Sequence, residues 1–194
     1  MLKRFFLWLF KSKKWQLITP VPNEAKNCVM IAAPHTSNWD FVYTMSALDQ
    51  LGVNPRFTIK KEFNKFPLNV IFNAMGALWI DRTAKGEGEE RKSMTEIMAD
   101  LFLKAQDPLC MVVTVEGTRS RNTKWKTGFY YAALAAGVPI CLAYMDYEKR
   151  TCGVCSCFKP TGDIEKDMRA IMDFYRDKVG KHPEKFALDE RYKD

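Results

Sequence analysis

Short apolar runs alternate with amphipathic stretches along most of this chain. Several of the runs are rich in β-branched residues and bounded by Gly, Pro or charged residues, which is typical of buried strands. Between them, apolar residues recur every three or four positions, the spacing that places them on one face of a helix. We therefore expect strands over residues 28–33, 56–60, 76–80, 109–115, 138–144 and 151–158. Helices are expected over residues 38–51, 66–74, 94–105, 128–136 and 163–179.

This alternation indicates an α/β fold with a mixed, largely parallel sheet covered by helices on both faces. The strand over residues 151–158 follows its predecessor after a short connection, so we expect it to be antiparallel. At 194 residues the chain is most simply one domain, residues 1–194, which is long enough to bury a substantial core. Residues 182–194 are expected to form a polar tail.

The first part of the domain, residues 1–20, is amphipathic and mixes aromatic residues with lysines. It fits an interfacial helix that sets its aromatic rings at the acyl boundary and its lysines against anionic headgroups. It equally fits an ordinary first helix packed on the core. No apolar run in the chain reaches the length of about 20 residues that a membrane-spanning helix needs.

Charge and cysteine content narrow the choice of partners and of compartment. Thirty Lys and Arg residues against 23 Asp and Glu give a net charge of +7, which favours an anionic partner. No nucleic-acid-binding motif accompanies this charge, so we expect no nucleic-acid partner. We expect the six cysteines to be reduced thiols of a cytosolic protein. Cys152, Cys155 and Cys157 lack a second ligand pair for zinc beyond His182, so we favour a strand here and predict no metal.

A histidine stands where the first buried strand ends. His35 follows the apolar run 28–33, and Asp40 comes five positions later, after residues suited to cap a helix. Histidine can take a proton from a hydroxyl and return it near neutral pH, and a carboxylate on its far nitrogen would orient it. The alternative is a hydrogen-bonded core histidine without catalytic function.

Other chemically distinctive residues also fall just after predicted strands. In α/β sheets functional groups gather beyond the carboxyl ends of the strands, so we expect these residues to share a site. Arginine forks can hold phosphate oxygens, lysine adds a point charge, and glycine lets the backbone approach an anion. The residues concerned are Lys60, Arg82, Glu116, Gly117, Thr118 and Arg119.

Four of these segments stand in the order of the sequence blocks of a known enzyme family. The chain resembles the glycerolipid acyltransferases, and within them the 1-acylglycerol-3-phosphate (lysophosphatidate) acyltransferase family. The resemblance covers residues 35 to 140, the centre of the chain. The segments are His35-x4-Asp40, Ile80-Asp81-Arg82, Glu116-Gly117-Thr118-Arg119-Ser120 and Val138-Pro139-Ile140.

The resemblance implies a glycerol-3-phosphate acyltransferase-like fold and transfer of a fatty acyl chain from a thioester of acyl carrier protein or coenzyme A. The acceptor would be a hydroxyl of a lysophospholipid, at the inner face of a membrane to which a cytoplasmic enzyme binds peripherally. His35 would be the general base and Asp40 its orienting partner. Arg82 and residues 116–119 would bind the acceptor head group, and Val138 and Pro139 would shape the acyl pocket. No metal or other cofactor is implied.

Two other functions fit parts of the pattern. A thioesterase or lipid hydrolase would use the same histidine and aspartate with water as acceptor, although no Gly-x-Ser-x-Gly motif is present. A non-catalytic protein that binds anionic membranes would explain the charge alone. The acceptor could be lysophosphatidate, another lysolipid or an acylated amino acid. The acyl donor, the chain-length preference, the oligomeric state and insertion of residues 1–17 into lipid stay open as well.

Overall fold

The computed structural model describes residues 2–80 and 92–193 and contains a seven-stranded sheet in the order β1-β7-β6-β2-β5-β3-β4. All strand pairs are parallel except β6 and β7, as predicted for residues 151–158. The strands are β1 (Gln16–Leu17), β2 (Cys28–Ala33), β3 (Pro55–Lys60), β4 (Ala77–Ile80), β5 (Cys110–Val113), β6 (Ile140–Asp146) and β7 (Thr151–Phe158).

Strand β2 is the centre of the sheet because its side chains are apolar on both faces. It pairs with β5 on one side, with Val29 opposite Met111, and with β6 on the other, with Val29 opposite Ile140. Residues buried on both faces are typical of parallel strands with helices above and below. The carboxyl end of β2 therefore lies in the middle of the row of strand ends on one side of the sheet.

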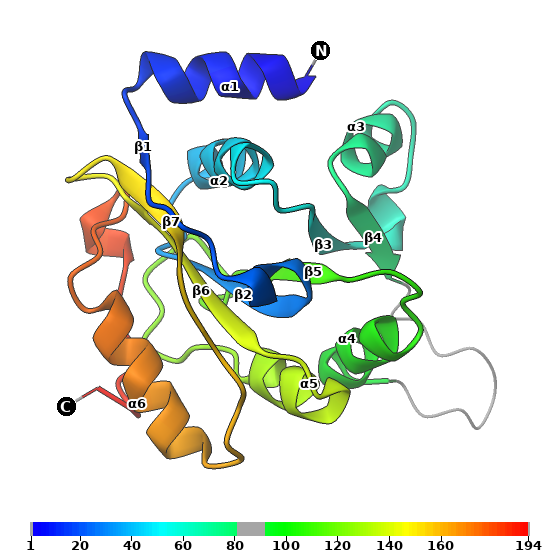
Figure 1. Cartoon of the computed structure of the whole chain (residues 1–194), viewed down its shortest axis with the longest axis vertical. Helices are drawn as coiled ribbons and strands as arrows, with labels where there is room; N and C mark the ends of the chain where they lie inside the picture. Colours follow the sequence, from blue (N-terminus) through cyan, green and yellow to red (C-terminus); the bar gives the residue numbers. More distant parts are fainter. Residues whose placement is uncertain (1, 81–91, 194) are drawn as a thin grey trace.

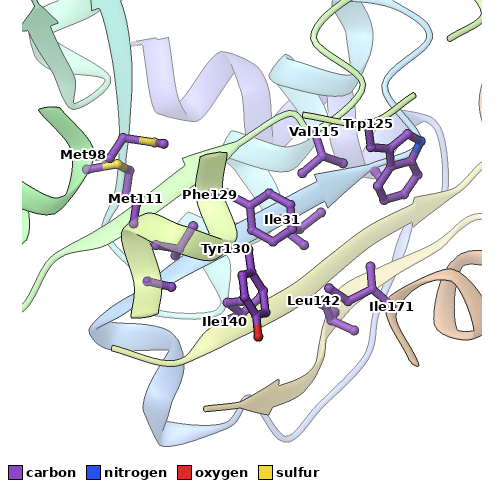
Figure 2. Packing of buried hydrophobic residues seen from close by; sticks show 14 of the residues in the cluster. Ile31, Met98, Met111, Val115, Trp125, Phe129, Tyr130, Ile140, Leu142 and Ile171 are labelled. Atoms are coloured by element: carbon purple, nitrogen blue, oxygen red, sulfur yellow. The ribbon is translucent and has the colours of Figure 1, made fainter. Parts of the chain in front are cut away.

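Helices cover both faces of the sheet, as the sequence predicts (Figure 1). Helices α1, α2 and α3 lie on one face, and α4, α5 and α6 lie on the other. Figure 2 shows the larger core cluster, where Phe129 and Tyr130 of α5 pack with Ile31, Met111 and Ile140 of the strands. The helices are α1 (Leu2–Ser12), α2 (Asn38–Gln50), α3 (Leu68–Ala74), α4 (Met94–Leu103), α5 (Gly128–Ala136) and α6 (Ile164–Tyr175).

The amphipathic N-terminal segment forms α1, which lies over α2 (Figure 1). Phe10 is buried and stacks near Trp15 at a ring-centroid distance of 6.2 Å, whereas Phe5 and Trp8 are exposed. One side of the helix thus packs on the core, as expected for a first helix of the domain, and the other faces outward. Its predicted place at a membrane interface stays a prediction. Within the described residues, no helix is long and apolar enough to cross a membrane.

Two expectations are wrong. Cys141 and Cys157 form a disulfide between β6 and β7, so these cysteines are not free thiols. A register shift at Leu142 and Ala143 sets Cys157 opposite Cys141. The C-terminal segment is also more than a polar tail, because Phe186 and Leu188 pack against the core and the buried Asp189 accepts a hydrogen bond from the backbone N–H of Trp125 at 2.9 Å.

Candidate active site

The turn from β2 into α2 carries His35 and Asp40. Ser37 caps α2 and its hydroxyl accepts from the Trp39 N–H at 3.2 Å, while Asp40 completes a capping box. Oδ2 of Asp40 accepts from the backbone N–H groups of Thr36 and Ser37 at 2.7 and 2.8 Å. These bonds satisfy donors that a helix start leaves free, and they fix the Asp40 carboxylate beside the histidine.

His35 and Asp40 form a pair in the lining of a cavity. The His35 Nδ1 lies 3.5 Å from Asp40 Oδ2, a distance at which charges interact and a small movement makes a hydrogen bond. The His35 side chain is 14% exposed and that of Asp40 is 5% exposed. Because Nδ1 faces Asp40, Nε2 is the nitrogen left to exchange a proton with a bound molecule.

A tyrosine that the sequence analysis missed completes the pair. The Tyr147 hydroxyl donates to Asp40 Oδ1 at 2.6 Å, and its ring meets Trp15 edge-on at a centroid distance of 4.9 Å. Burial, and then the hydrogen bond to Asp40, raise the pKa of Tyr147, so its phenol keeps its proton. Tyr147 is the first residue after β6, so the rule that selected His35 at its strand end also applies here.

Glu116 lies behind His35 rather than beside it. Its Oε1 accepts from the His35 backbone N–H at 2.7 Å, and among the described residues no donor reaches its Oε2. Burial raises the pKa of Glu116 to about 7, and the hydrogen bond from His35 opposes part of this rise. The Glu116 side chain thus holds the turn that carries His35, whereas the resemblance implies contact with the acceptor.

Cations stand at the cavity beyond His35. Arg119 and Lys126 are exposed and line the cavity together with Gly117. Gly117 has φ of +70°, and a Cβ there would lie 3.3 Å from the Lys126 side chain. Only glycine combines this backbone with the close approach of the lysine. Sequence analysis missed Lys126, whose only signal is its place before α5, which begins at Gly128.

The cavity has a volume of about 1030 Å³, and most of the side chains that line it are apolar. It exists because β3 pairs with β5 only at Pro55 and Arg56, and then continues along β4. Where the two strands part, the cavity reaches residues of both sheet faces, such as Leu48 of α2 and Met98 of α4. It therefore offers a large, mostly apolar space whose lining includes His35.

Several predicted site residues lie elsewhere. Lys60 is exposed at the end of β3 and does not line the cavity, and the Thr118 hydroxyl accepts from the Ser120 N–H at 3.2 Å. Val138 and Pro139 precede β6, whose start pairs with the start of β2. They therefore lie near the amino ends of these strands, whereas His35 follows the carboxyl end of β2. The predicted acyl-pocket role of these two residues thus has no counterpart in this cavity. Arg82 lies outside the described residues.

Comparison with known proteins gives the class of this site. The family model described as Acyltransferase matches residues 16–145, more than half of the chain, so the chain belongs to the acyltransferase family and is an enzyme of that class. Among solved structures, it is similar to the 1-acyl-sn-glycerophosphate (LPA) acyltransferase PlsC from Thermotoga maritima, with a TM-score of 0.55 and 15% identity. That match covers 93% of this chain and 80% of the other and shows a shared fold. A search of curated proteins gave no match.

Proposed function

We propose that this enzyme transfers a fatty acyl chain from a thioester, of acyl carrier protein or of coenzyme A, to a hydroxyl of a lysophospholipid such as 1-acylglycerol-3-phosphate. One observation carries the proposal: the His35–Asp40 pair stands where a large apolar cavity meets Arg119 and Lys126. A base, an apolar cavity and cations are the parts that an acyl chain and an anionic acceptor require.

In the reaction, His35 Nε2 takes the proton of the acceptor hydroxyl while the hydroxyl oxygen bonds to the thioester carbonyl carbon. The carbon–sulfur bond then breaks, and the leaving thiolate takes the proton from the imidazolium. His35 returns to its neutral form without a covalent enzyme intermediate. Asp40 stabilises the imidazolium, and the donors of Thr36, Ser37 and Tyr147 hold its side chain in place.

The acyl chain would occupy the cavity along α2. From Phe41 near the start of this helix to Leu48 near its end, seven steps of the helical rise span roughly 10 Å. Both side chains line the cavity, as do Met45 and Met98. Burial of each methylene contributes about 0.8 kcal/mol, so this space favours long chains.

The acceptor's anionic head group would lie against Arg119 and Lys126. Both are exposed, so they can meet a head group that stays in contact with water while the hydroxyl enters toward His35. A guanidinium can hold phosphate in a bidentate way, and an ammonium adds charge without fixed geometry. We place the enzyme peripherally at an anionic membrane surface, where such acceptors reside.

Incubation of the purified protein with a labelled long-chain acyl thioester and a panel of acceptors tests this function. The panel contains lysophosphatidate, lysophosphatidylcholine and an acylated amino acid. We expect labelled diacyl product with the phosphate-bearing acceptor and little free fatty acid. Release of fatty acid at one rate with and without acceptor would instead identify a thioesterase.

A further inference from the structure

The segment that connects β3 to α3, together with α3 itself, presents large apolar side chains to solvent. Phe66 is 84% exposed and Val70 is 58% exposed. None of the residues of α3 is buried, although the helix is mostly apolar. We name this region the α3 surface, and its exposed apolar residues are Phe63, Phe66, Leu68, Val70 and Ile71.

The other side of α3 is anchored to the protein. Phe72 lies edge-on to Phe57 at 6.4 Å and to Trp79 at 6.2 Å between ring centroids, and the Trp79 indole donates to Asn73 Oδ1 at 2.6 Å. The helix is therefore held in this orientation. Contiguous exposed apolar groups on a held element mark an interaction site.

Charge around the α3 surface indicates the kind of partner. Lys60, Lys61 and Lys65 accompany it, with Glu62 as the one acidic residue from 60 to 75. Protruding aromatic and aliphatic side chains among lysines fit an anionic bilayer, because the apolar groups enter the acyl boundary while the ammonium groups meet phosphates. A rigid protein partner would instead need a matching hollow for Phe66.

The position of α3 connects this surface to the cavity and to α1. Phe72 lines the cavity from the anchored side of α3. Figure 1 shows α1 and α3 along the same side of the molecule, and α1 also presents an exposed aromatic residue, Trp8, which is 63% exposed. Two apolar elements on one side can meet one membrane plane.

We propose that the α3 surface inserts into the headgroup and acyl boundary of an anionic bilayer, and so sets the cavity next to the hydrocarbon from which acyl chains enter. This inference rests on the proposed function for the identity of what enters the cavity, but the docking itself does not. Membrane binding then has a second anchor besides α1, located beside the cavity.

Vesicle binding by the Phe66→Ser/Val70→Ser double variant tests this. The control is Leu103→Ser, because Leu103 is 69% exposed but lies at the end of α4 on the other face of the sheet. On vesicles of phosphatidylglycerol with phosphatidylcholine, we expect the double variant to lose at least about tenfold in partition, since each lost side chain removes buried apolar area. We expect the control to bind like wild type, and binding to be weaker on pure phosphatidylcholine.

Equal partition of the double variant and wild type would overturn the proposal. So would loss of binding by a Trp8→Ser protein together with unchanged binding by the double variant, since α1 would then be the sole anchor. A concentration-dependent dimer in ultracentrifugation, abolished by the double variant without a change in vesicle binding, would assign the surface to a second copy.

Activity assays separate this proposal from the proposed function. With a water-soluble short-chain thioester and acceptor, we expect the double variant to match wild type, and with vesicle-embedded acceptor to be slower by about the loss in partition. If neither protein transfers acyl chains but the double variant still loses vesicle binding, the docking proposal stands and the proposed function fails. Equal rates on the vesicle-embedded acceptor would count against docking.

Discussion

Replacement of Tyr147 by Phe tests how the catalytic pair is held. The substitution removes the hydroxyl that donates to Asp40 Oδ1 at 2.6 Å and keeps the ring that packs against Trp15. Oδ1 then loses its donor, while Oδ2 keeps the N–H groups of Thr36 and Ser37. A carboxylate with less hydrogen bonding attracts the imidazole proton more strongly and is less firmly oriented.

The size of the effect follows from the kind of bond lost. A hydrogen bond to a charged group contributes about 1.5–3 kcal/mol, which corresponds to roughly 10- to 100-fold in rate if the transition state loses all of it. Because the Thr36 and Ser37 donors remain, we expect the lower end, about a tenfold fall in kcat. The acid limb of the rate against pH should move to higher pH, with the KM of the thioester little changed.

Steady-state kinetics over a pH series measure both effects, with Tyr43→Phe as the matched control. Tyr43 belongs to the same buried aromatic cluster, with its ring 6.4 Å from that of Tyr147, but it is not among the described donors to Asp40. We expect Tyr43→Phe to keep the wild-type profile. If Tyr147→Phe lowered only the melting temperature and left kcat and its pH profile unchanged, Tyr147 would be structural and the reasoning wrong.

Two further predictions concern residues around the pair. The pKa of Glu116 rises from 4.5 to about 7 on folding, so between these pH values the folded state binds a proton that the unfolded state has lost. The free energy of unfolding of the wild type therefore falls as pH rises from 4.5 to 7, and Glu116 contributes ~3 kcal/mol to this fall. In urea unfolding at several pH values, Glu116→Gln should lack this pH-dependent loss of stability. An equal dependence of the free energy of unfolding on pH in both proteins would refute the prediction. Lys126→Ala should raise the KM of a phosphate-bearing acceptor about tenfold with a smaller change in kcat. An unchanged KM and salt dependence would remove Lys126 from the acceptor site.

The element types and the strand-end position of His35 could be predicted because both depend on local patterns. Continuous apolar runs predict the strands β2 and β5, and Ser37 with Asp40 predicts the start of α2. The prediction that the sheet is largely parallel with helices on both faces is confirmed by the structure and by its likeness to a solved acyltransferase.

The rest depends on contacts between residues far apart in the chain. Tyr147 reaches Asp40 across 107 positions, and no local pattern distinguishes it from other tyrosines. The disulfide partner of Cys141 depends on a β-bulge that shifts the register by one residue. The cavity depends on the parting of β3 from β5, which is a property of pairing and not of either strand alone. The predicted place of Val138 and Pro139 in the acyl pocket rests on the resemblance alone.

The most direct test of the account compares the two histidines of the chain. Wild type, His35→Ala and His182→Ala are assayed for ester formation with the same acyl thioester and lysophospholipid, after circular dichroism shows that each is folded. The His182 side chain is 41% exposed and pairs with Glu184 at 3.8 Å. Its contact with the His35 turn is made by the backbone N–H, which donates to the Thr36 hydroxyl at 3.2 Å and which an alanine keeps. We expect His35→Ala to lose at least about a hundredfold in turnover, as for loss of a general base, and His182→Ala to keep the wild-type rate. Near wild-type turnover by a folded His35→Ala protein would contradict the central claim.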